Sequence, residues 1–313
     1  MTCWPRQSRY ARSVSALDKK QRKPLTRRLI QVYTALLYNA YLKGFAEGQI
    51  YTGPLKSVCV PGLNCYSCPG AISACPLGSL QNAVSASADR PAFYVAGLII
   101  MFGMFLGRVV CGFLCPFGLI QELLHKIPSP KIKKNNITRK LSWCKYVILA
   151  VFVIAIPAFY AVRRLPLPAF CKFICPAGTL EGAVMLLIHP ANSDLREMTG
   201  GLFWWKFTVM ILILTACVFV FRAFCRFLCP LGALYSLFAK IALLGVRVDL
   251  PKCTDCGACV KYCPVDIRKV GDRECVQCGN CIDVCPEKAI SFKAGKLVLR
   301  GPDINPAGGE EHT

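Results

Sequence analysis

Eight cysteines near the C-terminus have the spacing that places thiolates around two iron–sulfur clusters. They form the run Cys253-x2-Cys256-x2-Cys259-x3-Cys263-Pro264 and its repeat Cys275-x2-Cys278-x2-Cys281-x3-Cys285-Pro286. In such a run the fourth cysteine ligates the other cluster. We therefore expect one [4Fe–4S] cluster on Cys253, Cys256, Cys259 and Cys285, and a second on Cys275, Cys278, Cys281 and Cys263. Two zinc sites are the alternative, but zinc does not require the proline after each fourth cysteine.

A second cysteine pattern occurs four times before this run. Cys-Pro-x-Gly motifs begin at Cys75, Cys115, Cys175 and Cys229, and three of them follow a cysteine four residues earlier, namely Cys111, Cys171 and Cys225. The first motif has Ala71 at that position but carries Cys59, Cys65 and Cys68 upstream. A [4Fe–4S] cluster takes four thiolates, so the motifs must pair. Each proline is expected to open a short helix, where its missing N–H is harmless.

Each motif follows an apolar segment of the chain. The four segments are Leu29–Ala46, Ala92–Gly107, Tyr146–Val162 and Leu202–Phe221. With flanking residues they approach the ~20 residues of a transmembrane helix, which predicts about four spans arranged as two duplicated halves. A mean hydropathy of +0.44 together with a net charge of +21 is typical of a membrane protein with basic loops. We expect no nucleic-acid partner, because the basic residues lie beside apolar spans rather than along one soluble face.

The basic residues also predict an orientation. Residues 125–145 contain seven lysines and arginines and no acidic residue, so the positive-inside rule places this loop and both termini in the cytoplasm of a prokaryotic cell. The ends of spans two and four then share the cytoplasmic side, which pairs Cys111 and Cys115 with Cys225 and Cys229. The ends of spans one and three share the outer side, which brings Cys171 and Cys175 to Cys59, Cys65, Cys68 and Cys75.

Six cysteines on the outer side exceed the needs of one cluster. Either two of them are spare or disulfide-bonded, or the site is not a simple cubane. Cys75 aligns with the other motifs and is the first choice as a ligand, followed by Cys65 and Cys68. A disulfide framework for all 21 cysteines is the general alternative. It does not fit, because short C-x2-C and C-x3-C-P runs are too close for long-range bridges and indicate metal–thiolate sites instead. Such sites imply that at least the ferredoxin part lies in a reducing compartment.

The expected fold is therefore a mainly α membrane protein with Cys-Pro-initiated helices, followed by a small α+β two-cluster ferredoxin domain. We divide the chain into a basic N-terminus (1–28), a membrane domain (29–245), the ferredoxin domain (246–300) and a flexible tail (301–313). Basic residues beside the motifs (Arg108, Arg222 and Arg226) are expected to tune a cluster, to hold an anionic partner or to act as cytoplasmic anchors.

These motifs resemble those of the membrane "4Fe-4S binding" proteins of the NapH, MauN and NosR type. The resemblance covers spans two to four, with Cys111/Cys115 and Cys225/Cys229, and the ferredoxin run, about two thirds of the chain. It implies electron transfer between a quinol or cytoplasmic donor and an outer-face acceptor. The extra motif at Cys171/Cys175 and the cysteine-rich segment 59–75 depart from the NapH pattern and favour a longer redox chain.

We interpret the chain as an electron relay of the kind used in anaerobic respiration. A cytoplasmic ferredoxin or reductase would donate electrons, two clusters would lie in the ferredoxin domain, and one or two more in the membrane domain. Because the hydrocarbon core is about 30 Å thick, either the Cys-Pro segments dip inward or a quinone or a partner's flavin fills the gap. The alternatives are a quinol-linked oxidoreductase subunit and a redox maturation or regulatory protein. No catalytic residue set stands out, so an electron-transfer subunit is expected rather than a stand-alone enzyme.

Overall fold

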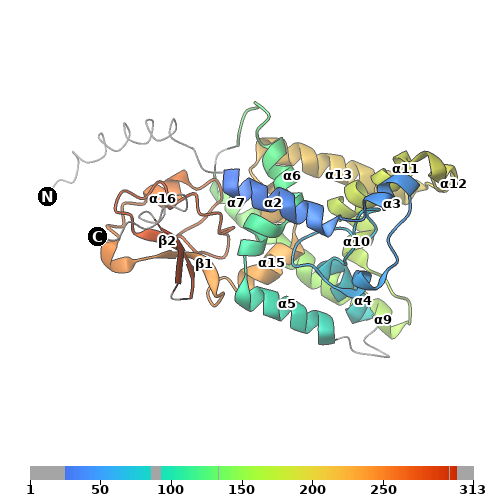
Figure 1. Cartoon of the computed structure of the whole chain (residues 1–313), viewed down its shortest axis with the longest axis horizontal. Coiled ribbons are helices and arrows are strands. Elements are labelled where there is room, and N and C mark those ends of the chain that lie inside the picture. The colour runs from blue at the N-terminus through green and yellow to red at the C-terminus, as the bar shows by residue number, and fades with distance from the viewer. Residues whose placement is uncertain (1–24, 86–92, 133, 296, 302–313) are drawn as a thin grey trace.

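A body of helices is joined to a small module that contains a three-stranded sheet (Figure 1). The computed structural model describes residues 25–85, 93–132, 134–295 and 297–301. Most of the basic N-terminal segment expected at 1–28, and nearly all of the tail expected at 301–313, lie outside the described residues. The coarse expectation of a mainly α protein with a small α+β domain is confirmed.

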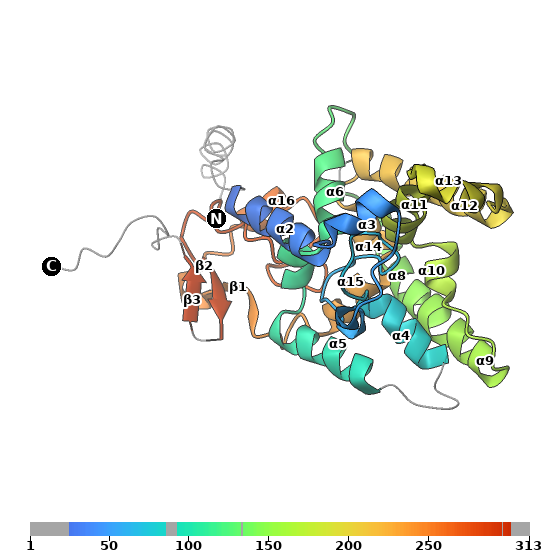
Figure 2. The same ribbon diagram turned by 45° about the vertical axis from the view of Figure 1, so that its right-hand side comes forward.

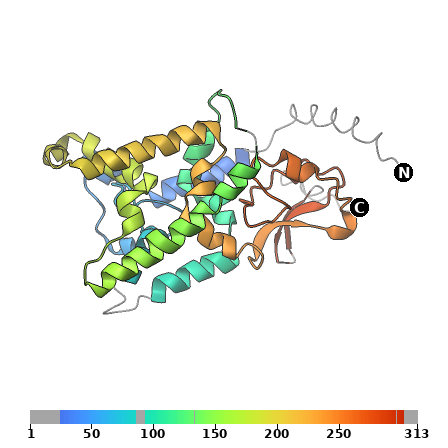
Figure 3. The same cartoon turned by 180° about the vertical axis from the view of Figure 1, so that it is seen from behind.

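Within the described residues, two helices are long and apolar enough to cross a membrane, Asn136–Val162 and Gly201–Phe219 (α13). The first consists of α7 (Asn136–Leu141), α8 (Cys144–Ile148), the π-helical η4 (Leu149–Ala155) and α9 (Ile156–Val162). The wide turns of η4 lie directly before Pro157, whose missing N–H interrupts the regular helical hydrogen bonding. In Figure 3 this helix and α13 both extend along the body, away from the module.

The expectation of four spans is not confirmed. The first expected span forms α2 (Leu25–Tyr38) and the separate α3 (Leu42–Glu47), and the second forms α5 (Phe93–Phe105). Within the described residues, α2 and α5 comprise 14 and 13 residues, fewer than the ~20 that a bilayer requires. Asn39 explains part of the difference, since its side chain donates to Ala35 O and to Asn64 Oδ1 at the break between α2 and α3.

The Cys-Pro-x-Gly motifs open helices, as expected. Prolines stand at the start of α4 (Pro76–Ser85), α6 (Pro116–Leu124) and α15 (Pro230–Leu237), and Pro176 precedes the π-helical η5 (Gly178–Val184) and α11 (Met185–Ile188). The preceding cysteines lie on short turns: the π-helical η3 (Val110–Leu114), α10 (Ala169–Phe173) and α14 (Ala223–Phe227). Connecting turns complete the body: η2 (Pro54–Ser57), η6 (Pro190–Asn192) and α12 (Ser193–Glu197). Figure 2 shows α4 and α10 on the side of the body remote from the sheet.

The module is an antiparallel sheet with cysteine-bearing loops. Its strands β1 (Leu244–Val248), β2 (Ile290–Ala294) and β3 (Leu297–Arg300) are hydrogen-bonded in that order, and η7 (Leu250–Lys252) and α16 (Ala258–Tyr262) lie between the first two strands in sequence. The small core of the module includes Val109 from the body. The ring of Phe113 also meets that of Phe292 edge-on, 5.7 Å between centroids. The module is therefore packed on the body through apolar side chains.

Candidate iron–sulfur sites

The first ferredoxin set lies around a hollow at the surface of the module. All four cysteines expected for the first cluster line it: Cys253, Cys256, Cys259 and Cys285. Cys253 and Cys256 are exposed. Gly257 has φ +70°, a conformation that glycine adopts without strain, and it begins α16, which carries Cys259.

The second ferredoxin set lies deeper. Each thiol of Cys263, Cys275, Cys278 and Cys281 is within electrostatic range of the other three. Burial raises the pKa of the Cys263 thiol to about 12, so this group is protonated at neutral pH until a metal ion displaces its proton. Cys281 also interacts with Cys259 of the first set, so the two sets are neighbours.

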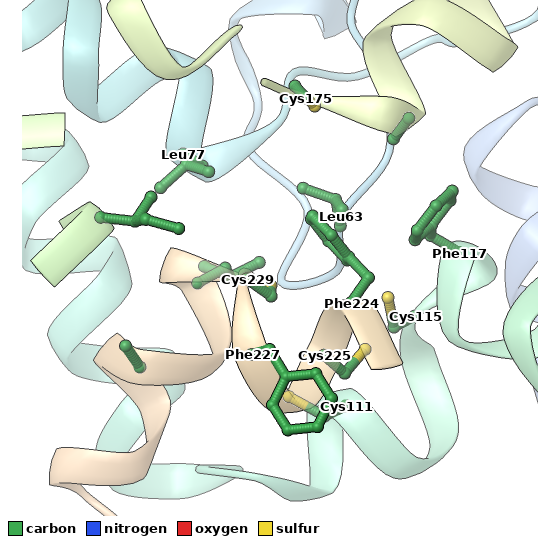
Figure 4. Close-up of a cluster of buried hydrophobic side chains, with 14 of the residues drawn as sticks. Leu63, Leu77, Cys111, Cys115, Phe117, Cys175, Phe224, Cys225, Phe227 and Cys229 are labelled. Carbon is green, nitrogen blue, oxygen red and sulfur yellow. The ribbon is translucent and has the colours of Figure 1, made fainter. Parts of the chain in front are cut away.

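A third set lies in the part of the body nearest the module, and we call it the proximal site. A cavity is lined by all four of its cysteines, Cys111, Cys115, Cys225 and Cys229. They come from η3, α14 and the starts of α6 and α15, and each is buried. Figure 4 shows the sulfurs of Cys111, Cys115 and Cys225 near one another, with Cys229 on the other side of the same space. These are the four cysteines that the sequence predicts to pair.

Two arginines in the proximal site each donate a hydrogen bond to a backbone carbonyl of the opposite motif. Arg108 and Arg222 each precede the first cysteine of their motif by three residues, and their exposed fractions are 1% and 0%. Arg108 Nη1 donates to Gly232 O at 2.9 Å, and Arg222 Nη1 donates to Cys111 O. A Cβ atom on Gly232 would lie 2.9 Å from Arg108 Nη1, so this position favours glycine. Both arginines are buried inside the protein rather than placed as anchors at a lipid surface.

Two glutamates balance these buried cations. Glu122 pairs with Arg222 at 2.6 Å and with Arg27 at 2.7 Å. Glu274, next to Cys275 in the module, pairs with Lys145 at 2.5 Å and lies 3.8 Å from Arg108. Such pairing offsets the cost of taking charges out of water. The sequence alone does not reveal these pairs, since they join residues 95 to 166 positions apart.

The fourth set, the distal site, lies on the far side of the body from the module. Each thiol of Cys65, Cys75, Cys171 and Cys175 is within electrostatic range of the other three. Cys68 interacts with Cys65 of this group, but its own thiol and that of Cys59 also have other hydrogen-bonding partners. The Cys59 sulfur is 3.3 Å from Ser79 Oγ, and the Cys68 thiol accepts the amides of Gly70 and Ala71. The six cysteines on this side of the body form no disulfide in the described structure, which favours two spare cysteines over a disulfide-bonded pair.

The glycine of every motif has a direct role at the sulfur. In each Cys-Pro-x-Gly motif the glycine amide donates to the sulfur of the motif cysteine, as Gly178 does to Cys175 at 3.4 Å and Gly232 to Cys229 at 3.3 Å. Gly118 and Gly78 make the equivalent bonds to Cys115 and Cys75. Free amides at a helix start favour negative charge. The motif therefore presents a thiolate where the backbone stabilises it.

One short segment touches both body sites. The amide of Leu63 donates to the Cys115 thiol of the proximal site, and the next amide, that of Asn64, donates to the Cys75 thiol of the distal site. Leu63 is 2% exposed, and Figure 4 shows it between Cys175 and the group of Cys111, Cys115 and Cys225. The two body sites are thus separated by one stretch of backbone rather than by the thickness of a bilayer.

The proximal site also touches the module. Gly112, the residue after Cys111, is so close to the residue after Cys275 that a Cβ atom on Gly112 would lie 2.5 Å from Val276 O. Four cysteine sets therefore form a chain of neighbours from the surface of the module to the distal site.

The donor sets suit clusters better than single ions. Among the described residues, no three His, Cys, Asp or Glu side chains are placed to hold one metal ion. A cubane instead has an iron at each of four corners, each with its own thiolate. Four sulfurs around a space, as at the proximal site, match that requirement.

Comparison with known proteins agrees with this geometry. A model described as a 4Fe-4S binding domain matches residues 91–135, 145–190 and 202–251, and a second model of that description matches 246–269 and 270–291. An uncharacterized protein of Methanocaldococcus jannaschii is 30% identical over 208 residues, which cover 62% of this chain and 76% of that protein. The chain belongs to the membrane-type 4Fe-4S binding proteins that include MauN and NosR.

Two further relatives show the breadth of this family. The methylamine utilization ferredoxin-type protein MauN of Methylobacillus flagellatus is 24% identical over 80% of this chain and 79% of its own length. The regulatory protein NosR of Pseudomonas aeruginosa is 27% identical over 55% of this chain, but over only 22% of its own length. No solved structure matches significantly. The family is one of iron–sulfur electron-transfer proteins, as the sequence motifs predict.

Proposed function

We propose that this protein relays electrons between a cytoplasmic donor, such as a ferredoxin or reductase, and an acceptor in or beyond the membrane. The four cysteine sets described above would hold four [4Fe–4S] clusters, which supply one-electron chemistry when bound. Each passage oxidises the donor by one electron and reduces the acceptor by one electron, and no bond is made or broken in the protein.

The observation that carries this proposal is the pair of consecutive amides at Leu63 and Asn64. One donates to a thiol of the proximal site and the next to a thiol of the distal site. This answers the difficulty that a bilayer core of about 30 Å is long for one hop. With the contact of Gly112 and Val276, it supports a path that needs no quinone or flavin between the sets.

The surface of the module supports a cytoplasmic donor. The hollow at Cys253 and Cys256 is also lined by five basic residues and three acidic ones: Lys240, Arg247, Arg268, Lys269, Arg273, Asp255, Asp272 and Glu287. A basic rim of this kind raises the association rate of an acidic protein partner. We therefore place the docking site of the donor here, at the most exposed thiols.

Anaerobic purification with iron and sulfide analysis tests the proposal. About sixteen irons per chain, four for each cluster, are expected. About eight irons would leave clusters only in the module and would overturn the relay. A variant in which serine replaces Cys115, Cys225 and Cys229 is expected to contain about four irons fewer than the wild type. Serine at Cys59 is the matched control, and we expect no loss of iron there.

A further inference from the structure

Gln81 and Gln121 occupy equivalent places in two of the four motifs. Each is the sixth residue after its motif cysteine, on α4 and α6 respectively, and each is fully buried. Gln81 Nε2 donates to Cys171 Sγ at 3.2 Å, and Gln121 Nε2 donates to Cys225 Sγ at 3.1 Å. Each body site thus contains a hydrogen bond from a glutamine side chain to a cysteine sulfur. The glutamine lies on the helix of one motif, and the sulfur belongs to the first cysteine of the motif that pairs with it.

The remaining bonds fix the direction of these amides. The Gln81 oxygen accepts the backbone N–H of Phe170 at 2.9 Å, and the Gln121 oxygen accepts that of Cys225 at 3.4 Å. Each amide also donates to a carbonyl of its own helix, at 3.3 Å in both cases. A carboxamide has two donor hydrogens, so one is used on the helix and the other on the sulfur. Turning the amide over would place its oxygen against the sulfur.

The other two motif helices carry different residues at this place. Glu181 Oε2 accepts the Cys65 amide at 2.8 Å, and the Tyr235 hydroxyl donates to Pro61 O at 2.9 Å. Both therefore contact backbone on the segment 61–65 instead of sulfur. Each site is left with one glutamine that bonds to a thiolate position.

A hydrogen bond to a ligating sulfur stabilises the more negative, reduced form of a cluster and raises its reduction potential. A buried bond is not screened by water and acts more strongly. We propose that Gln81 and Gln121 are positioning residues that hold Cys171 and Cys225 in place and raise the reduction potentials of the distal and proximal sites respectively. This inference rests on the proposed function, because it requires clusters at both sites.

Anaerobic redox titration followed by EPR tests the inference on the full chain. Gln121→Met and Gln81→Met keep the length of the side chain but remove the amide. Each variant is expected to lower one midpoint potential and leave the others unchanged, and the two variants should affect different components. We expect about a tenfold fall in the reduction equilibrium constant, about 59 mV for a one-electron couple. Tyr235→Phe, which loses a bond at the equivalent place but not one to sulfur, is the control and should shift nothing.

Iron analysis separates the possible failures. A wild-type chain with about eight irons would refute the proposed function rather than the tuning. Unchanged potentials in variants that retain their iron would overturn the role of the glutamines, and so would a shift of one shared component by both variants. If a methionine variant loses a cluster, Gln121→Glu or Gln81→Glu replaces it in the titration. Glutamate keeps the side-chain oxygen that accepts the backbone N–H. Loss of the cluster there as well would show that the glutamines only hold the ligands and would overturn their role in raising the reduction potentials.

Discussion

Glu274 is the residue on which the charge balance between module and body depends. It lies beside Cys275, yet its carboxylate meets Lys145 and Arg108 of the body, whose side chains are 0% and 1% exposed. At the same boundary Asp266 of the module accepts from Arg226, and from Thr138 at 2.5 Å. The sequence places Arg108 and Arg226 beside the motifs and Lys145 in the basic loop 125–145, but it cannot show that acidic residues of the module face them.

Replacing Glu274 by Gln is expected to destabilise the protein by about 3–5 kcal/mol, because Lys145 would lose its charged partner in a buried site. Denaturant unfolding in detergent measures this change. The matched control is Glu47→Gln, which breaks the exposed pair with Lys43 and should cost no more than about 0.5 kcal/mol. Equal losses in the two variants would contradict the role assigned to Glu274.

At the scale of elements, the turn η3 forms the contact between body and module. A methyl group at Gly112 would collide with Val276 O, so Gly112→Ala must push the module away or distort η3. We expect a loss of about 1–3 kcal/mol, faster hydrogen exchange around Val276 and slower electron transfer into the body. Gly97→Ala on α5, where nothing lies within 4 Å of the added carbon, is the control. It should cost no stability, since alanine has the higher helix propensity, and it should leave hydrogen exchange and electron transfer unchanged.

Some features of these elements could be predicted from the sequence, and others could not. Proline after cysteine predicts the starts of α4, α6 and α15 because the rule is local. The need for four thiolates predicts that the motifs pair, and the expected order of the spans, which the structure does not confirm, predicts which motifs pair. The crossing of Arg108 and Arg222 and the bonds of Gln81 and Gln121 could not be predicted, because they join segments that only the packed helices bring together. The break at Asn39 was missed for a similar reason, since part of its bonding is to Asn64.

For the whole molecule, the basic rim around Cys253 and Cys256 predicts strong salt dependence. Reduction by an acidic ferredoxin, followed by stopped-flow absorbance, should slow at least tenfold between low and high ionic strength. Arg273→Glu combined with Lys269→Glu should abolish most of that dependence. Lys126→Glu, outside the rim, is the control. A rate that does not respond to salt would argue that the donor docks elsewhere.

The interleaving of the motifs has a consequence for how the protein is made. The first ligands of the distal site, Cys65 and Cys75, precede its last ligands, Cys171 and Cys175, by about a hundred residues. The ligands of the proximal site likewise extend from Cys111 to Cys229. Neither half of the body contains all four cysteines of a cluster site. A growing chain on the ribosome therefore acquires the distal site first, then the proximal site and finally the module. A cluster can be inserted into the body only after both halves have packed together, because a single half lacks a complete ligand set.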